Sequence, residues 1–244
     1  MKKINLIITA LLLSTASLSA VSAPFTQEQE QRIRELIRET LVTQPQILDE
    51  AIGELQKQEI AKQDSVLKNL LKDNAAKLYN SADSPKIGPK NAALTLVYFT
   101  DYNCPYCKQF EASLEKVMAK HADVNLIIKP LPYLGDSSQS SAELALTLWQ
   151  TQPEKFAAFH QGLISKNGRH DQASIQKVLS QINMPKLTAT AQAKASLENN
   201  TRLAETLGVG GTPVTVVGDT MLMGLVPYED LEAAVVAALK QSKS

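Results

Sequence analysis

Apolar residues recur three and four positions apart from Thr26 to about Leu78, and this spacing places them on one side of a helix. Thr26 is followed three residues later by Gln29, which is the pattern of a capping box. Pro45 interrupts the pattern, so two helices are expected. The stripe residues are Ile33, Leu36, Ile37 and Leu41 in the first helix and Leu48, Ile52, Leu55, Val66, Leu67, Leu70, Leu71 and Leu78 in the second.

This helical region is too thinly apolar to form a core of its own, so its stripes are expected to pack against a partner. We favour a second copy of the chain, which makes residues 24–84 a helical N-terminal extension that acts as an oligomerisation stalk. The alternative is that both helices fold back on the main domain. The polar stretch Gln56 to Ser65 is expected to be either an exposed helix or a hinge.

The main domain is predicted to cover 85–244, because the turn-rich segment 81–89 marks a boundary. A strand, a helix and a second strand follow in the order of a parallel crossover. Helical periodicity then dominates about 137–207, and two short strands joined by a tight turn indicate an antiparallel hairpin before a last helix. The fold class is therefore α/β, a mixed sheet with an inserted helical subdomain. The expected strands are 93–99, 124–129, 214–217 and 221–223, and the expected helices are one that ends near 120 and others at about 138–151, 153–166, 172–182, 195–207 and 227–240.

The candidate chemistry lies in Cys104 and Cys107, the only cysteines in the sequence, in the order Cys-Pro-Tyr-Cys after the first strand. A cysteine at the start of a helix lies over unpaired N–H groups and the positive end of the helix dipole, which favour the thiolate. A thiolate attacks disulfides, and a second cysteine one turn deeper can attack the mixed disulfide and release the partner. The pair therefore indicates a redox site, with Cys104 as nucleophile and Cys107 as resolving residue.

Other uses of this cysteine pair are weaker. A structural disulfide that closes so small a loop would add little stability. A structural zinc site needs four ligands, and the sequence has no second cysteine pair and no His-x-x-x-His spacing. His121, His160 and His170 are scattered and are expected to be ordinary surface or half-buried histidines. Met221 and Met223 could hold Cu(I) as paired thioethers, but packing or substrate contact is favoured.

The first 23 residues predict a secretory signal peptide, because Lys2 and Lys3 precede an apolar stretch that small residues follow. That stretch is too short to span a membrane, which requires about 20 residues. In an exported, oxidising compartment, a chain with only two cysteines is expected to use them in catalysis. Removing Lys2 and Lys3 from the 25 basic side chains leaves 23 against 25 acidic ones, and this charge of about −2 argues against nucleic-acid binding.

Two motifs carry a resemblance to a known family. The segment 99–107, Phe-Thr-Asp-Tyr-Asn-Cys-Pro-Tyr-Cys, and Gly-Gly-Thr-Pro at 210–213 resemble the thioredoxin-fold oxidoreductases of the DsbA superfamily over about residues 90–240. The N-terminal helical region, including Leu-Val-Thr-Gln-Pro-Gln-Ile-Leu at 41–48, is most similar to the suppressor-of-copper-sensitivity protein C family and related DsbA-like periplasmic proteins. The resemblance implies a thioredoxin fold, a periplasmic location and no bound cofactor.

The resemblance also implies how a substrate would bind. The Thr212-Pro213 peptide bond would be cis and would face the Cys104 sulfur, and the Thr212 backbone would pair with an extended client peptide. Pro105 and Tyr106, between the cysteines, would belong to the same binding surface. No metal site is expected, apart from Cu(I) held by the two cysteine thiolates.

One position departs from the family. Six residues before the first cysteine, where the family often has a buried acid, this chain has Tyr98, which is expected to pack in the core. The proton acceptor for Cys107 is therefore open, with Lys129, water and a carboxylate elsewhere as candidates. Tyr106 lacks the charge that a histidine would lend to the thiolate, so we expect a less oxidising pair than that of DsbA.

These patterns predict a periplasmic thiol:disulfide oxidoreductase that acts on unfolded or misfolded exported proteins. If the stalk assembles several copies, disulfide isomerase or reductase activity is expected, with a DsbD-like membrane reductase as partner. A monomer would favour a dithiol oxidase that a DsbB-like membrane oxidase resets. The alternative from another class is a copper-binding or copper-tolerance protein that uses the same cysteine pair.

Overall fold

The computed structural model describes residues 25–242 of the chain. The predicted signal peptide lies outside these described residues. The chain divides into two compact units, of which one ends at Glu59 and the other begins at Ile60. Among the helices of residues 25–242, none is both long and apolar enough to cross a membrane.

The unit that ends at Glu59 is helical, as the sequence pattern predicted, but the second helix ends at Asp73 and does not reach Leu78, which lies in a separate short helix. The capping box is present, since the Thr26 side chain accepts from the Gln29 N–H while the Gln29 side chain accepts from the Thr26 N–H. No residue of the first helix is buried. The polar stretch 56–65 has helical backbone, which is one of its two predicted states. The helices are α1, Gln27–Thr43, and α2, Gln46–Asp73, which continues past the unit boundary.

The unit that begins at Ile60 is built on a sheet whose described strands follow the order β1-β3-β2-β4-β5. β2 and β3 are parallel, as predicted, and the other neighbouring pairs are antiparallel. β4 and β5 form the predicted hairpin. β1 is only two residues long and lies in the segment predicted as turns, so periodicity could not reveal it. The strands are β1 Lys86–Ile87, β2 Leu94–Thr100, β3 Val124–Pro130, β4 Val214–Val217 and β5 Thr220–Met223.

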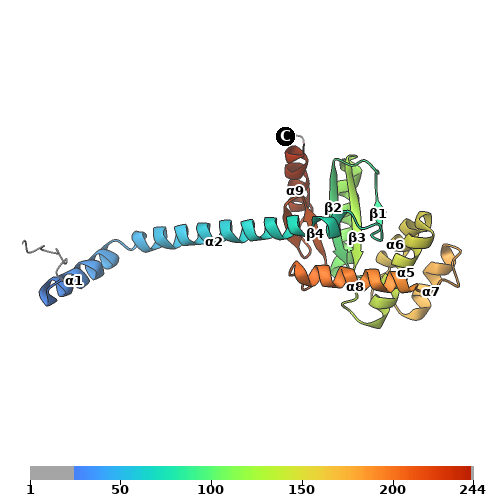
Figure 1. Ribbon diagram of the computed structural model, residues 1–244, viewed down its shortest axis with the longest axis horizontal. Coiled ribbons are helices and arrows are strands. Elements are labelled where there is room, and N and C mark those ends of the chain that lie inside the picture. The colour runs from blue at the N-terminus through green and yellow to red at the C-terminus, as the bar shows by residue number, and fades with distance from the viewer. Residues whose placement is uncertain (1–24, 243–244) are drawn as a thin grey trace, which may run out of the picture. The chain divides into compact units, whose positions relative to one another are not determined.

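The predicted helical subdomain lies between β3 and β4 in the chain, and Figure 1 shows α5, α6 and α7 gathered to one side of the strands. α8 begins four residues earlier than predicted, because the Thr190 side chain caps it by accepting from the Ala193 N–H at 3.0 Å. The fold is a thioredoxin fold with a helical insertion. The helices of this unit after α2 are α3 Ala75–Tyr79, α4 Pro105–Lys120, α5 Asp136–Thr151, a 3-10 turn at Pro153–Lys155, α6 Phe156–Ile164, α7 Gln172–Gln181, α8 Ala191–Thr206 and α9 Tyr228–Gln241.

Successive residues of β2 face two different hydrophobic clusters, one on each face of the sheet. Tyr98 packs in the first cluster with Phe110 of α4. Phe99 packs in the second, which also buries Leu71 of α2 and Leu78 of α3. For these two stripe residues the partner is therefore the main domain, as the alternative interpretation of the stripe predicted.

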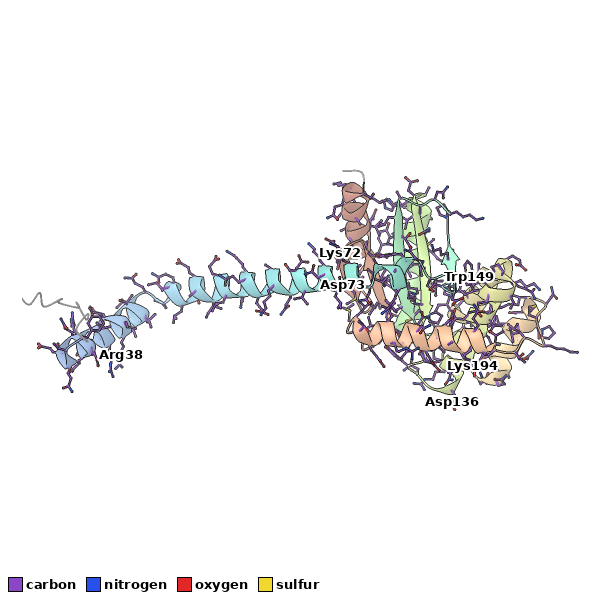
Figure 2. The ribbon with its side chains drawn as sticks, viewed as in Figure 1. Arg38, Lys72, Asp73, Asp136, Trp149 and Lys194 are labelled. Carbon is purple, nitrogen blue, oxygen red and sulfur yellow. The ribbon has the colours of Figure 1, made fainter. Side chains whose placement is uncertain are left out.

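Three hydrogen bonds from side chains of other elements help to fix the connection after α3 to the rest of this unit. Trp149 of α5, labelled in Figure 2, donates its Nε1–H to the Ala82 carbonyl oxygen at 2.9 Å. The Gln192 side chain donates to Asp83 at 2.8 Å, and the Lys129 amine donates to Ser84 at 2.8 Å. The bonding side chains belong to α5, α8 and β3, so the turn-rich segment is held against three elements of the unit.

Candidate active site

Cys104 is the N-cap residue of α4, and Pro105 stands at the start of the helix. Proline suits this position because its φ is already helical and the N–H that it lacks would have had no partner within the helix. The Cys104 sulfur therefore lies at the positive end of the helix dipole, as the sequence predicted. Both cysteines are free thiols, and Cys104 is 5% exposed while Cys107 is completely buried.

The loop that carries Cys104 is held by a buried carboxylate that the sequence analysis did not single out. Asp101 accepts from the Asn103 N–H and from the Ser138 hydroxyl, both at 2.7 Å, and from the Leu134 N–H at 3.0 Å. Asn103 in turn accepts from the His170 N–H at 2.7 Å. The loop that precedes Cys104 is thus tied by hydrogen bonds to the helical insertion.

The pKa values of the two thiols are shifted in opposite directions. The pKa of Cys104 is lowered to about 5, chiefly by the hydrogen bond from the Cys107 side chain, against the opposing effect of burial, and the Thr212 side chain and backbone N–H groups lower it further. The pKa of Cys107 is raised, chiefly by burial and then by its hydrogen bond to Cys104. At neutral pH the arrangement therefore favours a thiolate on the outer sulfur and a thiol on the inner one.

Thr212 and Pro213 lie against the outer sulfur. Their peptide bond is cis, and the Cys104 Sγ lies 3.2 Å from the Thr212 carbonyl oxygen. The resemblance implied both features. Pro213 is fixed to the turn after β5, because the Gly224 N–H donates to its carbonyl oxygen at 2.8 Å. An exchange partner that reaches Cys104 must therefore approach the Thr212 backbone.

Large apolar side chains are exposed beside the Thr212–Pro213 segment. Tyr106 is 57% exposed, Met223 51% and Leu225 42%. Tyr106 stands between the cysteines, and Met223 pairs with Val214, the residue after Pro213. Exposed apolar side chains beside a reactive group are typical of a surface that binds another protein. Leu225 was not predicted from the sequence, because its only signal there is its place directly after a strand and a glycine.

Tyr98 is a core residue, as predicted. Its ring is buried and lies 5.9 Å from that of Phe110, and its hydroxyl donates to the Cys107 carbonyl oxygen at 3.3 Å. Burial raises the pKa of Tyr98 well above its usual value, and negative charge on Cys107 or Glu111 would raise it further. A phenol that stays neutral at physiological pH cannot replace the acid that the family often has here.

Lys129, a candidate acceptor for the Cys107 proton, lies on the wrong face of the sheet. It pairs in register with Phe99, so it shares the face of the second cluster, whereas Cys107 belongs to the first. Its amine donates to Ser84, and it lines a cavity of about 590 Å³ with Arg202. Burial lowers the pKa of Lys129 to about 8, but its position rules it out as an acceptor.

His160 and His170 are not the ordinary surface or half-buried residues that the sequence analysis expected, because they are only 1% and 5% exposed. The His160 ring lies between two polar side chains, with Nε2 3.1 Å from Glu111 Oε1 and Nδ1 3.1 Å from the Tyr102 hydroxyl. His160 is 49 residues from Glu111 and 58 from Tyr102 in the chain, so no local pattern could reveal the cluster. The histidines and Glu111 are therefore additions to the candidate site.

Comparison with models of known protein families shows to which family the chain belongs. The DSBA-like thioredoxin domain matches residues 95–236, more than half of the chain. The chain belongs to the DsbA-like family. The N-terminal domain of the copper resistance protein ScsC matches residues 29–62, so the resemblance to ScsC is also confirmed.

Solved structures and a curated relative agree with this assignment. A linker-deletion mutant of Proteus mirabilis ScsC is 42% identical, with 90% of this chain and 99% of that chain covered and a TM-score of 0.71. A periplasmic thioredoxin-like protein from Salmonella enterica serovar Typhimurium is 43% identical, with 68% and 95% covered and a TM-score of 0.66. Disulfide bond formation protein D of Bacillus subtilis is 24% identical, with 64% and 77% covered. Membership of the DsbA-like family implies thiol–disulfide oxidoreductase activity.

Proposed function

We propose that this DsbA-like chain is an exported disulfide isomerase or reductase, in which Cys104 is the nucleophile and Cys107 the resolving cysteine. The observation that carries the proposal is the arrangement at the start of α4. Cys104 is the N-cap residue beside the cis Thr212–Pro213 bond, Cys107 is completely buried, and the pKa values of the two thiols are shifted in opposite directions. An ionised outer sulfur attacks, and a neutral inner sulfur cannot compete with it for the client.

The reaction begins with attack of the Cys104 thiolate on one sulfur of a client disulfide. The Cys104–client disulfide forms, and the other client sulfur leaves as a thiolate. In isomerisation that client thiolate, or another in the same client, attacks elsewhere and Cys104 is released unchanged. In reduction Cys107 attacks Cys104, so that the client leaves reduced and the pair becomes a disulfide.

The client is held as an extended segment beside Thr212. Its backbone pairs with that of Thr212, and its apolar side chains contact Tyr106, Met223 and Leu225, whose exposed surfaces lie beside the reacting sulfur. Surfaces of this kind recognise unfolded segments without requiring a particular sequence. Unfolded or misfolded exported proteins with cysteines are therefore the proposed clients.

The choice of isomerase over oxidase rests on the N-terminal unit. It exposes apolar residues along both helices, with exposed fractions of 54% at Ile37, 50% at Ile52 and 66% at Leu55. A helix with an apolar stripe and no core is stable when that stripe is covered, and a second copy supplies the matching stripe. Assembly would place several Cys104 thiolates around one client, which suits repeated exchange.

Location and partners follow from the same reasoning. The leader, Lys2-Lys3 before an apolar stretch, supports export, and the related Salmonella protein is described as periplasmic. An isomerase must keep Cys104 reduced in an oxidising compartment, so a DsbD-like membrane reductase is the proposed partner. A pair found mostly oxidised in cells would point instead to an oxidase and a DsbB-like partner.

Two experiments test the proposal. Cys107→Ala should accumulate mixed disulfides between Cys104 and exported proteins, which mass spectrometry detects, and Cys104→Ala should accumulate none. Light scattering should show an oligomer for the mature chain and a monomer for a variant that begins at Ile60. The cut belongs at Ile60 because a deletion through residue 80 would remove the buried Leu71 and Leu78. A monomeric mature chain would exclude the isomerase arrangement.

Copper tolerance is the second candidate, since the domain that matches residues 29–62 is named for copper resistance. The two sulfurs are soft ligands for Cu(I). Binding through both requires a Cys107 thiolate, however, and the raised pKa of Cys107 opposes this. Trapping of client proteins by Cys107→Ala separates the two functions, because a metal carrier forms no mixed disulfide.

A further inference from the structure

Cys107 must lose its proton before it can act as a nucleophile. The structure excludes some of the groups that could accept this proton. Cys107 is completely buried, which separates its thiol from bulk water. Tyr98 stays neutral and donates to the Cys107 carbonyl oxygen, and Lys129 lies on the other face of the sheet. The remaining sequence-based candidates are a water molecule and a carboxylate.

Of the two buried carboxylates in the described residues, Asp101 already accepts three hydrogen bonds on its two oxygens, whereas Glu111 has an oxygen without a partner. Glu111 lies four residues after Cys107 on α4, and both belong to the buried face of that helix. Residues at this spacing are neighbours, with Cβ atoms about 5–6 Å apart. Tyr98 donates to the Cys107 carbonyl oxygen, and negative charge on Cys107 or Glu111 raises the pKa of Tyr98, so both groups lie near this tyrosine.

The hydrogen bonds of Glu111 leave one oxygen ready to take a proton. Oε1 lies 3.1 Å from His160 Nε2, whereas Oε2 is buried and has no hydrogen-bond partner. A buried carboxylate oxygen without a partner costs free energy, which a proton on that oxygen or a bridging water would recover.

The histidine keeps Glu111 in place in either protonation state. When the Tyr102 hydroxyl donates to Nδ1 of His160, Nε2 carries the proton and donates to Oε1. That bond persists when Oε2 becomes protonated, because Oε1 still accepts. The titratable groups that the structure places around Glu111 are Tyr98, Tyr102, Cys107 and His160.

We propose that Glu111 accepts the Cys107 proton on Oε2, through one water molecule, while His160 and Tyr102 position the carboxylate. The inference rests on the proposed function of the cysteine pair. As the S–H proton moves to Glu111, the Cys107 sulfur attacks Cys104 of the mixed disulfide. The Cys104–Cys107 bond forms, the bond from Cys104 to the client breaks, and the client sulfur leaves as a thiolate. In the reverse direction Glu111 returns the proton to the departing Cys107.

The test separates the two chemical steps by stopped-flow with 4,4′-dithiodipyridine and the reduced, full-length mature protein. Attack of Cys104 releases one thiopyridone, and attack of Cys107 releases the second in a phase whose rate is independent of reagent concentration. An internal base predicts that this second rate changes less than about twofold between pH 6 and 8. Deprotonation by hydroxide predicts a rise of about tenfold per pH unit.

Glu111→Gln keeps the shape of the side chain and an acceptor for His160 but cannot take the proton. We expect its second phase to be at least about tenfold slower at pH 7 and to rise about tenfold per pH unit, with the first phase unchanged. Glu115→Gln, an exposed change one turn further along α4, is the matched control and should behave like the wild type.

The two phases distinguish a failure of the role proposed for Glu111 from a failure of the function proposed for Cys104. If the rate of the second phase in Glu111→Gln does not depend on pH, the role proposed for Glu111 is overturned. If the first phase of that variant is as rapid as in the wild type, the function proposed for Cys104 still stands. Loss of the first phase in the wild type would instead overturn the proposed function itself. If Glu111→Gln fails to fold, the wild-type profile still decides, because a rise of about tenfold per pH unit there excludes an internal base.

Discussion

The two units treat their apolar side chains in opposite ways. In the unit that ends at Glu59, α1 has no buried residue, and Ile37 and Leu55 are more than half exposed. In the unit that begins at Ile60, the sheet separates two buried clusters, and Leu78 is completely inaccessible to solvent. One unit has a core, and the other leaves its apolar side chains exposed, which is why we propose that a second copy covers them.

From this difference we expect thiol chemistry and the proposed assembly to be separable in the chain. Both cysteines, Thr212, Asp101 and Glu111 lie in the unit that has its own core. Single-step thiol chemistry should therefore survive changes in the N-terminal unit. Isomerisation, which needs several exchanges on one client, should depend on both units.

The largest effect that this comparison predicts is the loss of exchange on replacing the nucleophile. Cys104→Ala should lower the rate of reduction of a model disulfide at least about 1,000-fold, because Cys107 is buried and neutral and cannot take over. Turbidity during insulin reduction measures this. The oligomeric state should not change, and a variant that loses both properties would show that chemistry and assembly are coupled.

The second effect is on stability, and two leucines provide a matched pair. Leu78→Ala should lower the free energy of unfolding of the unit that begins at Ile60 by about 2–5 kcal/mol, because the residue is completely buried. Leu55→Ala, at a position that is 66% exposed, should change the monomer by less than about 0.5 kcal/mol. Urea unfolding in a Leu36→Glu, Ile37→Glu background, which keeps both leucines and is expected to be monomeric, gives both values. Equal losses would contradict the division into two units.

The sequence predicted the features of the fold that local patterns encode. Apolar runs, turn residues and helical spacing predicted β2 to β5 and the long helices, and the Thr26 and Gln29 pair predicted the start of α1. β1 was missed because two residues show no periodicity. The partner of Leu71 and Leu78 was left between two alternatives, because a stripe reveals that a face is buried but not what covers it.

The residues of the candidate site also fall into those that local patterns identify and those that only the folded structure brings together. Cys104, Cys107, Thr212 and Pro213 lie in compact motifs, so the sequence alone was enough to identify them. Asp101, Glu111 and His160 work through contacts between elements that are distant in the chain, and no local pattern connects them. His160 was expected to be an ordinary residue because a single histidine carries no information about its neighbours.

The third effect concerns assembly alone. Changing both Leu36 and Ile37 of α1 to glutamate should dissociate the proposed oligomer, because charges on an apolar interface must lose their hydration. Isomerisation of scrambled ribonuclease should fall about tenfold or more, while reduction of a small disulfide stays within about twofold. Gln31→Glu adds charge away from the stripe and serves as the control. Unchanged isomerisation by a monomer would break the link between stalk and activity.

The smallest effect is a near absence of pH dependence in the reactivity of Cys104. With a pKa of about 5, its alkylation rate by iodoacetamide should change less than about twofold between pH 6 and 8, whereas a thiol of pKa near 8.5 would change about 75-fold. Cys107→Ala should restore part of the ordinary dependence, since the Cys107 side chain makes the largest contribution to the lowered pKa.

The same shift links pH to the stability of the reduced protein. The pKa of Cys104 is lower in the folded than in the unfolded chain, so its stabilising contribution is complete above about pH 8.5 and is lost as the pH falls toward 5. Reduced wild type should therefore gain stability relative to Cys104→Ala as the pH rises from 5 to 8, as urea unfolding would measure. All the groups that lower this pKa lie in the unit that begins at Ile60, so a variant starting there should give the same profile. A different profile would mean that the N-terminal unit influences the thiolate, and that the two units are not independent.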